Sequence, residues 1–191
     1  HSPHRGDRHR LRDIASRAAK EQCDKHVVKM IVESAQMLST AHRMLDGNYC
    51  KRPSVSGKTM SSYWELDDSR ESKLYKAVHM GHPCTVWTTE SSANYDWHVE
   101  HFEALCDEYT YRYERTHATD TKLRKALRRR PDNIPLCDLT PFKLAMGSNP
   151  ECMLPDPVES YRRFYETKQA RFIMTWSKRS MPKWFKKIEN N

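Results

Sequence analysis

One stretch of the sequence combines side chains that can move protons with a spacing that places them on one side of a helix. Successive residues on a helix lie about 100° apart, so five polar residues of the segment 23–45 fall within a sector of roughly 80°. These residues, called the polar strip below, are His26, Lys29, Glu33, Gln36 and Thr40. A carboxylate and an imidazole two turns apart are typical of sites that carry out acid–base chemistry. The alternative is structural: Lys29 and Glu33 are four residues apart and can simply satisfy each other.

The remaining circumference of this helix is almost entirely apolar, with residues such as Val27, Ile31 and Leu38. A surface helix has a broad polar face and a narrower apolar stripe, and this pattern is the reverse. It predicts a helix through the middle of the domain, with the polar strip lining an internal cleft. Gly47 is expected to end the helix as a left-handed C-cap.

Two further residues are candidates for walls of the same cleft. His82 precedes Pro83 in a Gly- and Pro-containing turn over 79–87, and a residue before proline is held in an extended conformation. Asn94 lies at the start of a second long helix, which the periodicity predicts over 91–116. A purely structural role is the alternative for both.

The segment 178–187 interleaves cations with aromatic residues, which suits a nucleic acid because cations neutralise phosphates and aromatic rings stack on exposed bases. The alternative is that Trp184 packs against the domain and leaves the lysines in water. The candidate DNA-binding residues of this segment are Lys183, Trp184, Phe185 and Lys186.

The overall charge points to a polyanionic partner. The 191 residues carry a formal net charge of +8, with a sequence pI near 9.2. Six Lys and Arg residues fall within 122–130 without an acidic residue, and further basic clusters lie in 1–20 and 178–187. Nucleic acid is the commonest target of such clusters, and simple solubility is the alternative.

Several function classes are disfavoured. The sequence has no phosphate-binding P-loop, dinucleotide-binding glycine motif, serine-hydrolase elbow or zinc-protease motif. Its six cysteines have no spacing that indicates a metal site, and we expect reduced thiols, no metal and no cofactor. There is no apolar run of about 20 residues and no signal peptide, so we expect no membrane partner and a location in the cytoplasm.

These signals predict an all-α (mainly α) fold: a compact domain of three long helices joined by long irregular connectors. We expect a basic, mobile segment over 1–22, in which residues 14–22 form a short helix or lead into the main one. A single helical domain is expected over 23–191, with a loop insertion at about 48–72. A short basic helix is predicted over 122–129, and a third long helix over 157–176 after the Pro-containing connector 130–157.

Three segments resemble the pyrimidine-dimer DNA glycosylases, the T4 endonuclease V family. Asp24-Lys25-His26, seven residues before Glu33, is similar to the Asp-x-His that precedes the catalytic Glu of that family. Gly81-His82, followed by Thr85, resembles its Gly-His-Val-Thr-aromatic turn. The segments 168–171 and 181–186 resemble its final helix and closing Pro-x-Trp-Tyr-Lys motif. The matches come in the family's order and cover about 40 residues.

This resemblance implies a DNA glycosylase that acts on a damaged or modified pyrimidine, flipped out of double-stranded DNA, and that works as a monomer. Glu33 would be the catalytic carboxylate, and His26 would support it and contact DNA. If the protein is encoded by a bacteriophage, its location is the host-cell cytoplasm. An AP-lyase activity that proceeds through a Schiff base is a further implication, although no chain-terminal amine near the helix corresponds to the family's nucleophile.

The chain departs from the family where arginines flank the catalytic Glu, because Val32 and Gln36 take those places. Phosphate contacts would then come from Lys29, Arg43 or the basic clusters. Two alternatives stay open. The same pocket could serve a DNA-base-modifying transferase for hypermodified pyrimidines, or the protein could be a non-catalytic DNA-binding protein.

Overall fold

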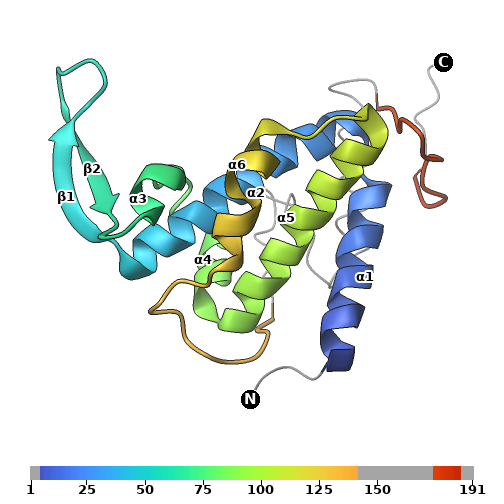
Figure 1. Ribbon diagram of the computed structural model, residues 1–191, viewed down its shortest axis with the longest axis horizontal. Coiled ribbons are helices and arrows are strands. Elements are labelled where there is room, and N and C mark those ends of the chain that lie inside the picture. The colour runs from blue at the N-terminus through green and yellow to red at the C-terminus, as the bar shows by residue number, and fades with distance from the viewer. Residues whose placement is uncertain (1–4, 142–173, 186–191) are drawn as a thin grey trace.

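A computed structural model describes residues 5–141 and 174–185 of the chain, with side chains from residue 12 onward. Within these residues the fold is mainly α-helical with one two-stranded sheet (Figure 1). The elements are α1 (Arg5–Glu21), α2 (Asp24–Asp46), β1 (Asn48–Pro53), β2 (Met60–Glu65), α3 (Arg70–Lys73), α4 (Pro83–Glu90), α5 (Ser92–Tyr113) and α6 (Ala118–Arg128).

The two long helices predicted from periodicity are present, within one residue at each end for α2 and within three for α5. They run antiparallel: Asp24, at the start of α2, bonds to Arg112 near the end of α5, whereas His42 near the end of α2 bonds to Tyr95 near the start of α5. The helices α1, α4 and α6 pack around this pair, and Figure 1 shows α1 alongside α5.

The main core fills the space between α2, α5 and α6, because each contributes an apolar stripe to it. Fully buried members include Ile31, Leu38, Phe102, Leu105 and Leu123. The prediction that α2 is buried on most sides is confirmed, since only a narrow line of its residues is partly open to solvent.

Two segments differ from the sequence-based expectation. In the basic segment 1–22, the short helix expected over 14–22 begins earlier, at Arg5, and it buries Ala15 and Ala19. The expected loop over 48–72 is instead an antiparallel hairpin, with Asn48 opposite Glu65 and Pro53 opposite Met60, followed by the one-turn helix α3. The hairpin projects from the opposite end of the molecule to α1 (Figure 1).

Gly47 does not end α2 in the left-handed conformation that we expected; its φ is −81° and its ψ is 152°. Its role is instead to permit a close approach. A Cβ atom at this position would lie 2.5 Å from the Arg43 carbonyl oxygen and 3.0 Å from Trp64 Cβ. Only a residue without a side chain lets β2 pack this closely on the end of α2.

Of the turn predicted over 79–87, the part before Pro83 is present, and His82 has the expected extended backbone (φ −65°, ψ 132°). Residues 83–87 instead belong to α4, which has Pro83 as its first residue. The short basic helix is also present, as α6. The expected helix over 157–176 lies outside the described residues up to residue 173, and residues 174–176 form no helix. Among the described helices, none has both the length and the apolar character needed to cross a bilayer.

Candidate functional site

The polar strip lies along the partly open side of α2. The side chain of Glu33 is 25% exposed and that of Lys29 is 51% exposed, and Lys29 Nζ lies 3.5 Å from Glu33 Oε1. His26 and Thr40, at the two ends of the strip, are buried. The side chain of Glu33 is therefore neither fully open to bulk solvent nor buried in the apolar core.

The turn before α4 covers the end of the strip that is nearer to the C-terminus of α2. Gln36 Oε1 lies 3.2 Å from His79 Nε2, and Thr40 Oγ1 donates to the Val78 carbonyl at 2.8 Å. His79 has a φ of 55°, a left-handed conformation that is uncommon for a residue with a side chain. The structure thus brings the His82 turn beside the polar strip.

His82 caps α4, because its Nδ1 accepts a hydrogen bond from Cys84 N at 3.1 Å. Its ring lies 6.3 Å from that of His79, centroid to centroid. A helix cap is a structural role, and it fixes the His82 ring at the margin of the site.

The other end of the strip lies near the C-terminal segment. Phe185 is buried against Cys23, just before α2, and its ring lies 5.0 Å from that of Trp176. A ring packed in this way does not stack on a base. Trp184 is half-buried in the same cluster and Lys183 is exposed, whereas Lys186 lies outside the described residues.

Asp24 holds this segment in place. Its carboxylate accepts hydrogen bonds from Arg112 Nη1 (3.0 Å), Thr175 Oγ1 (2.9 Å) and Ser177 N (2.8 Å). Burial alone would raise the pKa of Asp24, but the hydrogen bonds from Ser177, Thr175 and Arg112 outweigh it, and the pKa is lowered. The Asp-x-His motif thus contributes a residue that fixes the C-terminal segment to the start of α2.

Two buried histidines on α5 were not predicted from the sequence. His98 Nδ1 lies 2.8 Å from Thr88 Oγ1, and burial, with smaller electrostatic contributions from His101 and His82, lowers the pKa of His98 to about 3. His101 stacks on Trp97 at 5.3 Å, and burial lowers its pKa to about 4. Both are therefore neutral at pH 7. The two histidines are three residues apart on α5 and so share one face of it, and this spacing is the feature of the sequence that could have identified them.

Besides Phe185, two further predicted DNA-binding residues do not lie at an accessible site. Arg43 is 1% exposed and donates to the carbonyls of Tyr75 (2.7 Å) and Trp64 (2.8 Å) and to Glu71 Oε2 (2.8 Å). Asn94 is fully buried and bonds to the Trp87 carbonyl and to Thr140. Their hydrogen-bonding groups are used inside the protein, so the assignment of both residues to DNA is wrong in this structure.

The basic cluster 122–130 is also less positive than its sequence suggests, because all four arginines in it are paired. Their carboxylate partners come from α5, from α6 itself and from nearby loops. The pairs are Arg124 with Asp107 and Asp120, Arg128 with Glu103, Arg129 with Asp132 and Asp68, and Arg130 with Asp96.

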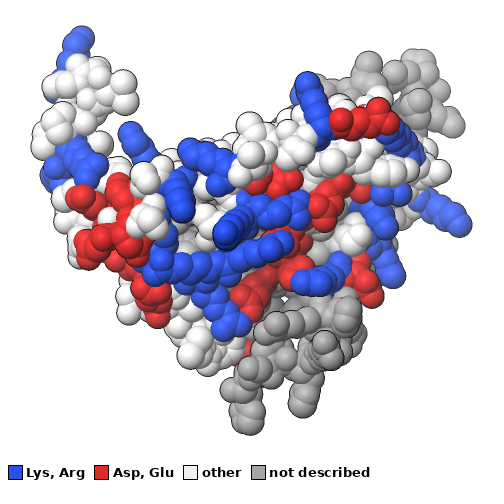
Figure 2. Space-filling model, viewed as in Figure 1, with Lys and Arg blue, Asp and Glu red and all other residues white. Residues whose placement is uncertain are grey.

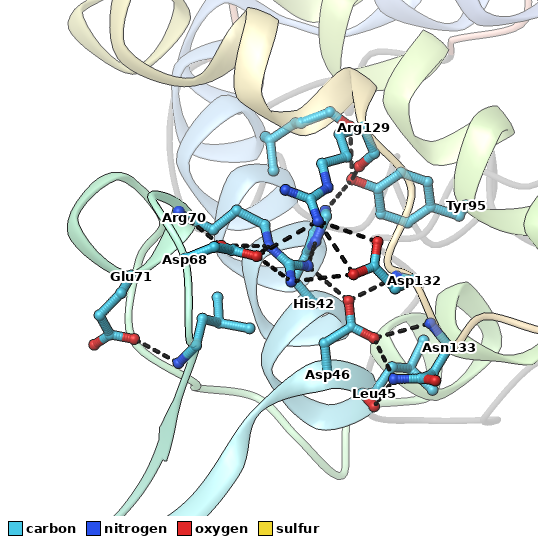
Figure 3. Close-up of polar contacts among 12 residues, drawn as sticks. His42, Leu45, Asp46, Asp68, Arg70, Glu71, Tyr95, Arg129, Asp132 and Asn133 are labelled. Atoms are coloured by element: carbon cyan, nitrogen blue, oxygen red, sulfur yellow. Dashed lines mark hydrogen bonds and ion pairs between the residues drawn. The ribbon is translucent and has the colours of Figure 1, made fainter.

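A buried ionic network, the Arg70 network, joins α2 to α3 and to the loop after α6 (Figure 3). Arg70 Nη1 lies 2.6 Å from Asp46 Oδ2 and 3.0 Å from His42 Nδ1, and its Nη2 donates to Asp68 Oδ2 at 2.9 Å. Asp46 also accepts from the backbone N–H groups of Asp132 and Asn133. Each guanidinium nitrogen of Arg70 thus has a hydrogen-bond partner, as a buried charge requires.

A groove of about 430 Å³ runs between α1, α5 and α6. Cations and carboxylates line it together, and they pair across it, as Arg12 does with Glu100 and Arg128 with Glu103. Such a groove has no strong preference for a ligand of either sign.

Among the described residues, no group of three or more His, Cys, Asp or Glu side chains is arranged to hold a metal ion. Cys84 is disulfide-bonded, so the prediction of six reduced thiols is wrong for this residue. Cysteine spacing along the chain does not show which thiols the fold brings together. Cys106 is a free thiol in the core, where burial raises its pKa.

No protein-family model, no curated protein and no solved structure matches this chain. The resemblance to the pyrimidine-dimer glycosylases therefore remains a prediction from three sequence motifs.

Proposed function

We propose that this protein is a DNA glycosylase that removes a damaged or modified pyrimidine from double-stranded DNA, with Glu33 as its catalytic carboxylate. The observation that carries the proposal is the position of Glu33, a half-buried carboxylate on a helix that is buried on most sides. Histidines lie at one end of its polar strip and an aromatic segment lies at the other. An endonuclease V-like arrangement of three long helices and a monomeric state are parts of the same proposal.

Cleavage of the glycosidic bond requires a carboxylate in such a position. When the bond between C1′ of the sugar and the base nitrogen breaks, its electron pair leaves with the base and positive charge develops on the sugar. An ionised carboxylate fixed next to C1′ stabilises that charge, and water then adds to C1′ to give an abasic site. The proton released by the water balances the one that the departing base takes up.

The Lys29–Glu33 pair has little value as a helix-stabilising contact. A lysine that precedes a glutamate by four residues is the less favourable order, and such pairs are worth only about 0.2–0.5 kcal/mol. In the proposed site Lys29 is a positioning residue that also faces the phosphates of DNA. Gln36 and His79, which bond to each other, form the wall against which a flipped base would lie.

The test compares E33Q with E100Q on ultraviolet-irradiated and base-modified duplex DNA. Glu100 is a matched control, because it is also a helical glutamate, 27% exposed, and paired with a cation, Arg12. We expect E33Q to lower the rate of abasic-site formation by at least roughly 100-fold while E100Q retains it. Equal activity of E33Q and the wild type would rule out the mechanism.

The same reactions test the AP-lyase and transferase alternatives. Borohydride traps a Schiff base as a covalent protein–DNA adduct, and loss of the adduct in K29Q would identify Lys29 as its amine. Base release without an adduct indicates a glycosylase that lacks lyase activity. Mass spectrometry of the nucleosides would reveal a transferase, which adds mass to a base and creates no abasic site.

A non-catalytic DNA-binding protein is the second candidate. It is favoured by the Lys29–Glu33 contact itself, since two residues that satisfy each other within one helix need no further role. This alternative predicts salt-dependent binding to DNA, no release of base from any substrate, and unchanged binding by E33Q.

A further inference from the structure

The cations near the hairpin fall into two groups that differ in their partners. The arginines form ion pairs, as Arg52 does with Glu65 (2.8 Å) and Arg128 with Glu103 (2.7 Å). The lysines of the same region are exposed, and none has a carboxylate within ion-pair distance in the described part of the chain. These lysines are Lys51 and Lys58 in the hairpin, Lys73 and Lys76 at and after α3, and Lys122 and Lys125 on α6.

Contacts through Tyr75 connect these groups across the fold. The Tyr75 hydroxyl bonds to Thr119 Oγ1 of α6 at 2.9 Å, and Lys122 Nζ lies 5.0 Å from the centre of the Tyr75 ring. Tyr75 itself stands between Lys73 and Lys76 in sequence. The unpaired lysines at and after α3 therefore lie close to those of α6. The hairpin is attached to the same segment by Arg43, which donates to the carbonyls of Trp64 and Tyr75.

This region is concave. Figure 2 shows the hairpin standing away from the body, with a hollow between it and the rest of the molecule, and Lys and Arg side chains along the hollow. We use the name lysine saddle for this hollow together with the six unpaired lysines carried by the hairpin, by α3 and the segment after it, and by α6. A concave surface with unneutralised positive charge on both sides suits a polyanion of substantial width.

The hairpin wall of the saddle is anchored. A two-stranded hairpin is only marginally stable by itself, so its orientation depends on contacts at its base. Arg43 supplies them: it donates to the carbonyl of Trp64 and to Glu71, and Glu71 accepts from the Tyr63 hydroxyl. The guanidinium of Arg52 lies 3.9 Å above the Tyr63 ring.

The Arg70 network fixes the adjoining helix α3. Figure 3 shows Arg70 directed at Asp46 of α2, with Asp68 and Asp132 beside it. The hairpin, α3 and the end of α6 are thus tied to α2 by buried, fully bonded arginines. The paired arginines fix the positions of the elements that form the saddle, and the unpaired lysines remain available to bind a ligand.

We propose that the lysine saddle binds the sugar–phosphate backbone of double-stranded DNA, an inference that rests on the proposed function for the identity of the polyanion. Lysine is a mobile point charge that contacts phosphates without reading base edges. The saddle then supplies affinity that does not depend on the DNA sequence, and it orients the duplex over α2. Base recognition is the role of the polar strip. The hairpin is an arm that encloses one side of the duplex.

The experiment measures the affinity for a short fluorescent duplex over a range of salt concentrations. The variants K51Q/K58Q and K122Q/K125Q each remove two saddle charges. The matched control R17Q/K20Q removes two charges from exposed cations on α1, at the other end of the molecule, which also have no ion pair in the described residues. Thermal unfolding checks that all three variants keep the stability of the wild type.

If the saddle binds DNA, each saddle variant weakens binding roughly tenfold at moderate salt. It also reduces the slope of log K against log salt by about 0.9 for each phosphate that the variant no longer neutralises. The control leaves both quantities nearly unchanged. Equal weakening in the control and the saddle variants overturns the proposal, because net charge alone would then explain binding.

The outcomes separate this inference from the proposed function. Release of base by saddle variants that bind as tightly as the wild type disproves the saddle and leaves the glycosylase in place. Binding through the saddle without release of base from any substrate disproves the glycosylase and leaves the saddle in place.

Discussion

The two ring nitrogens of His42 face partners that fix where its proton lies. Nδ1 is 3.0 Å from Arg70 Nη1, and an arginine nitrogen can only donate, so Nδ1 accepts. Nε2 therefore carries the hydrogen and donates to the Tyr95 hydroxyl at 2.7 Å, which in turn donates to the Leu127 carbonyl at 2.6 Å. If Nδ1 were protonated, its N–H group and the N–H group of Arg70 Nη1 would face each other as two donors with no acceptor between them.

This arrangement makes His42 a source of acid sensitivity. Burial, and then the charge of Arg70, lower the pKa of His42 to about 4, although Asp46 acts in the opposite direction and Arg129 adds a smaller lowering. The unfolded chain, with a His pKa near 6.5, binds more protons than the folded one between these values. The contribution of neutral His42 to the free energy of unfolding is therefore complete above about pH 6.5, and it is lost as the pH falls towards 4.

We expect H42Q, which keeps a donor to Tyr95, to reduce the fall in the free energy of unfolding between pH 7 and pH 5 by about 2 kcal/mol. Urea unfolding at several pH values measures this free energy of unfolding for H42Q and for the wild type. H79Q, at an exposed histidine, is the control and should leave the pH dependence unchanged. An unaltered pH dependence in H42Q would show that His42 is not neutral in the fold.

At this scale the sequence is a poor guide to which polar side chains are open to a ligand. Periodicity places Glu33 and Gln36 correctly on a partly open side of α2, because it decides which residues of a helix share a face. For Arg43, on the same helix, the prediction of a DNA contact is wrong. Its partners are backbone carbonyls of β2 and of the segment after α3, and such contacts between distant segments leave no local pattern.

Among the elements, α2 and α5 could be predicted because each has an uninterrupted 3.6-residue period over more than 20 residues. The hairpin could not. Its strands, NYCKRP and MSSYWE, are largely exposed on both faces and have no apolar–polar alternation, and six residues, rather than a two-residue turn, connect them. Its stability comes from Arg43 and Gly47 of other segments.

Gly47 gives a test of how the hairpin is attached. We expect G47A to lower the free energy of unfolding by about 2 kcal/mol, because the new methyl group meets the Arg43 carbonyl oxygen and Trp64 Cβ at distances that force a shift. Urea unfolding measures the change.

G81A is the matched control for this substitution. No atom lies within 4 Å of a Cβ atom at Gly81, so the change in stability should stay under about 1 kcal/mol. If G47A is as stable as G81A, the close approach of β2 to α2 is not a constraint on the fold.

On the scale of the whole molecule, buried carboxylates join segments that are far apart in sequence. Glu108 of α5 pairs with Arg112 and with Arg179, and Asp24 of α2 pairs with Arg112 and accepts from Ser177. Burial tends to raise the pKa of Glu108, and the bonds from Arg179 and Arg112 lower it overall. These contacts fix the C-terminal segment next to the start of the polar strip.

We expect D24N to loosen this attachment, because the amide keeps the shape of the carboxylate but loses its charge and part of its accepting capacity. The free energy of unfolding should fall by about 2 kcal/mol. Hydrogen exchange in residues 174–180 should become faster, while exchange in the middle of α5 changes little. D13N, at an exposed aspartate on α1, is the control. Unchanged exchange at 174–180 would contradict the role of Asp24.

The buried ion pairs around Arg43, Arg70 and Arg112 all use guanidinium groups, whereas the lysine saddle uses ammonium groups. Acylation modifies amines and spares guanidinium groups. A reagent or enzyme that acylates the exposed amines could therefore abolish attraction to polyanions in a protein that stays fully folded. The surface charge of this molecule is chemically separable from the charge that maintains its architecture.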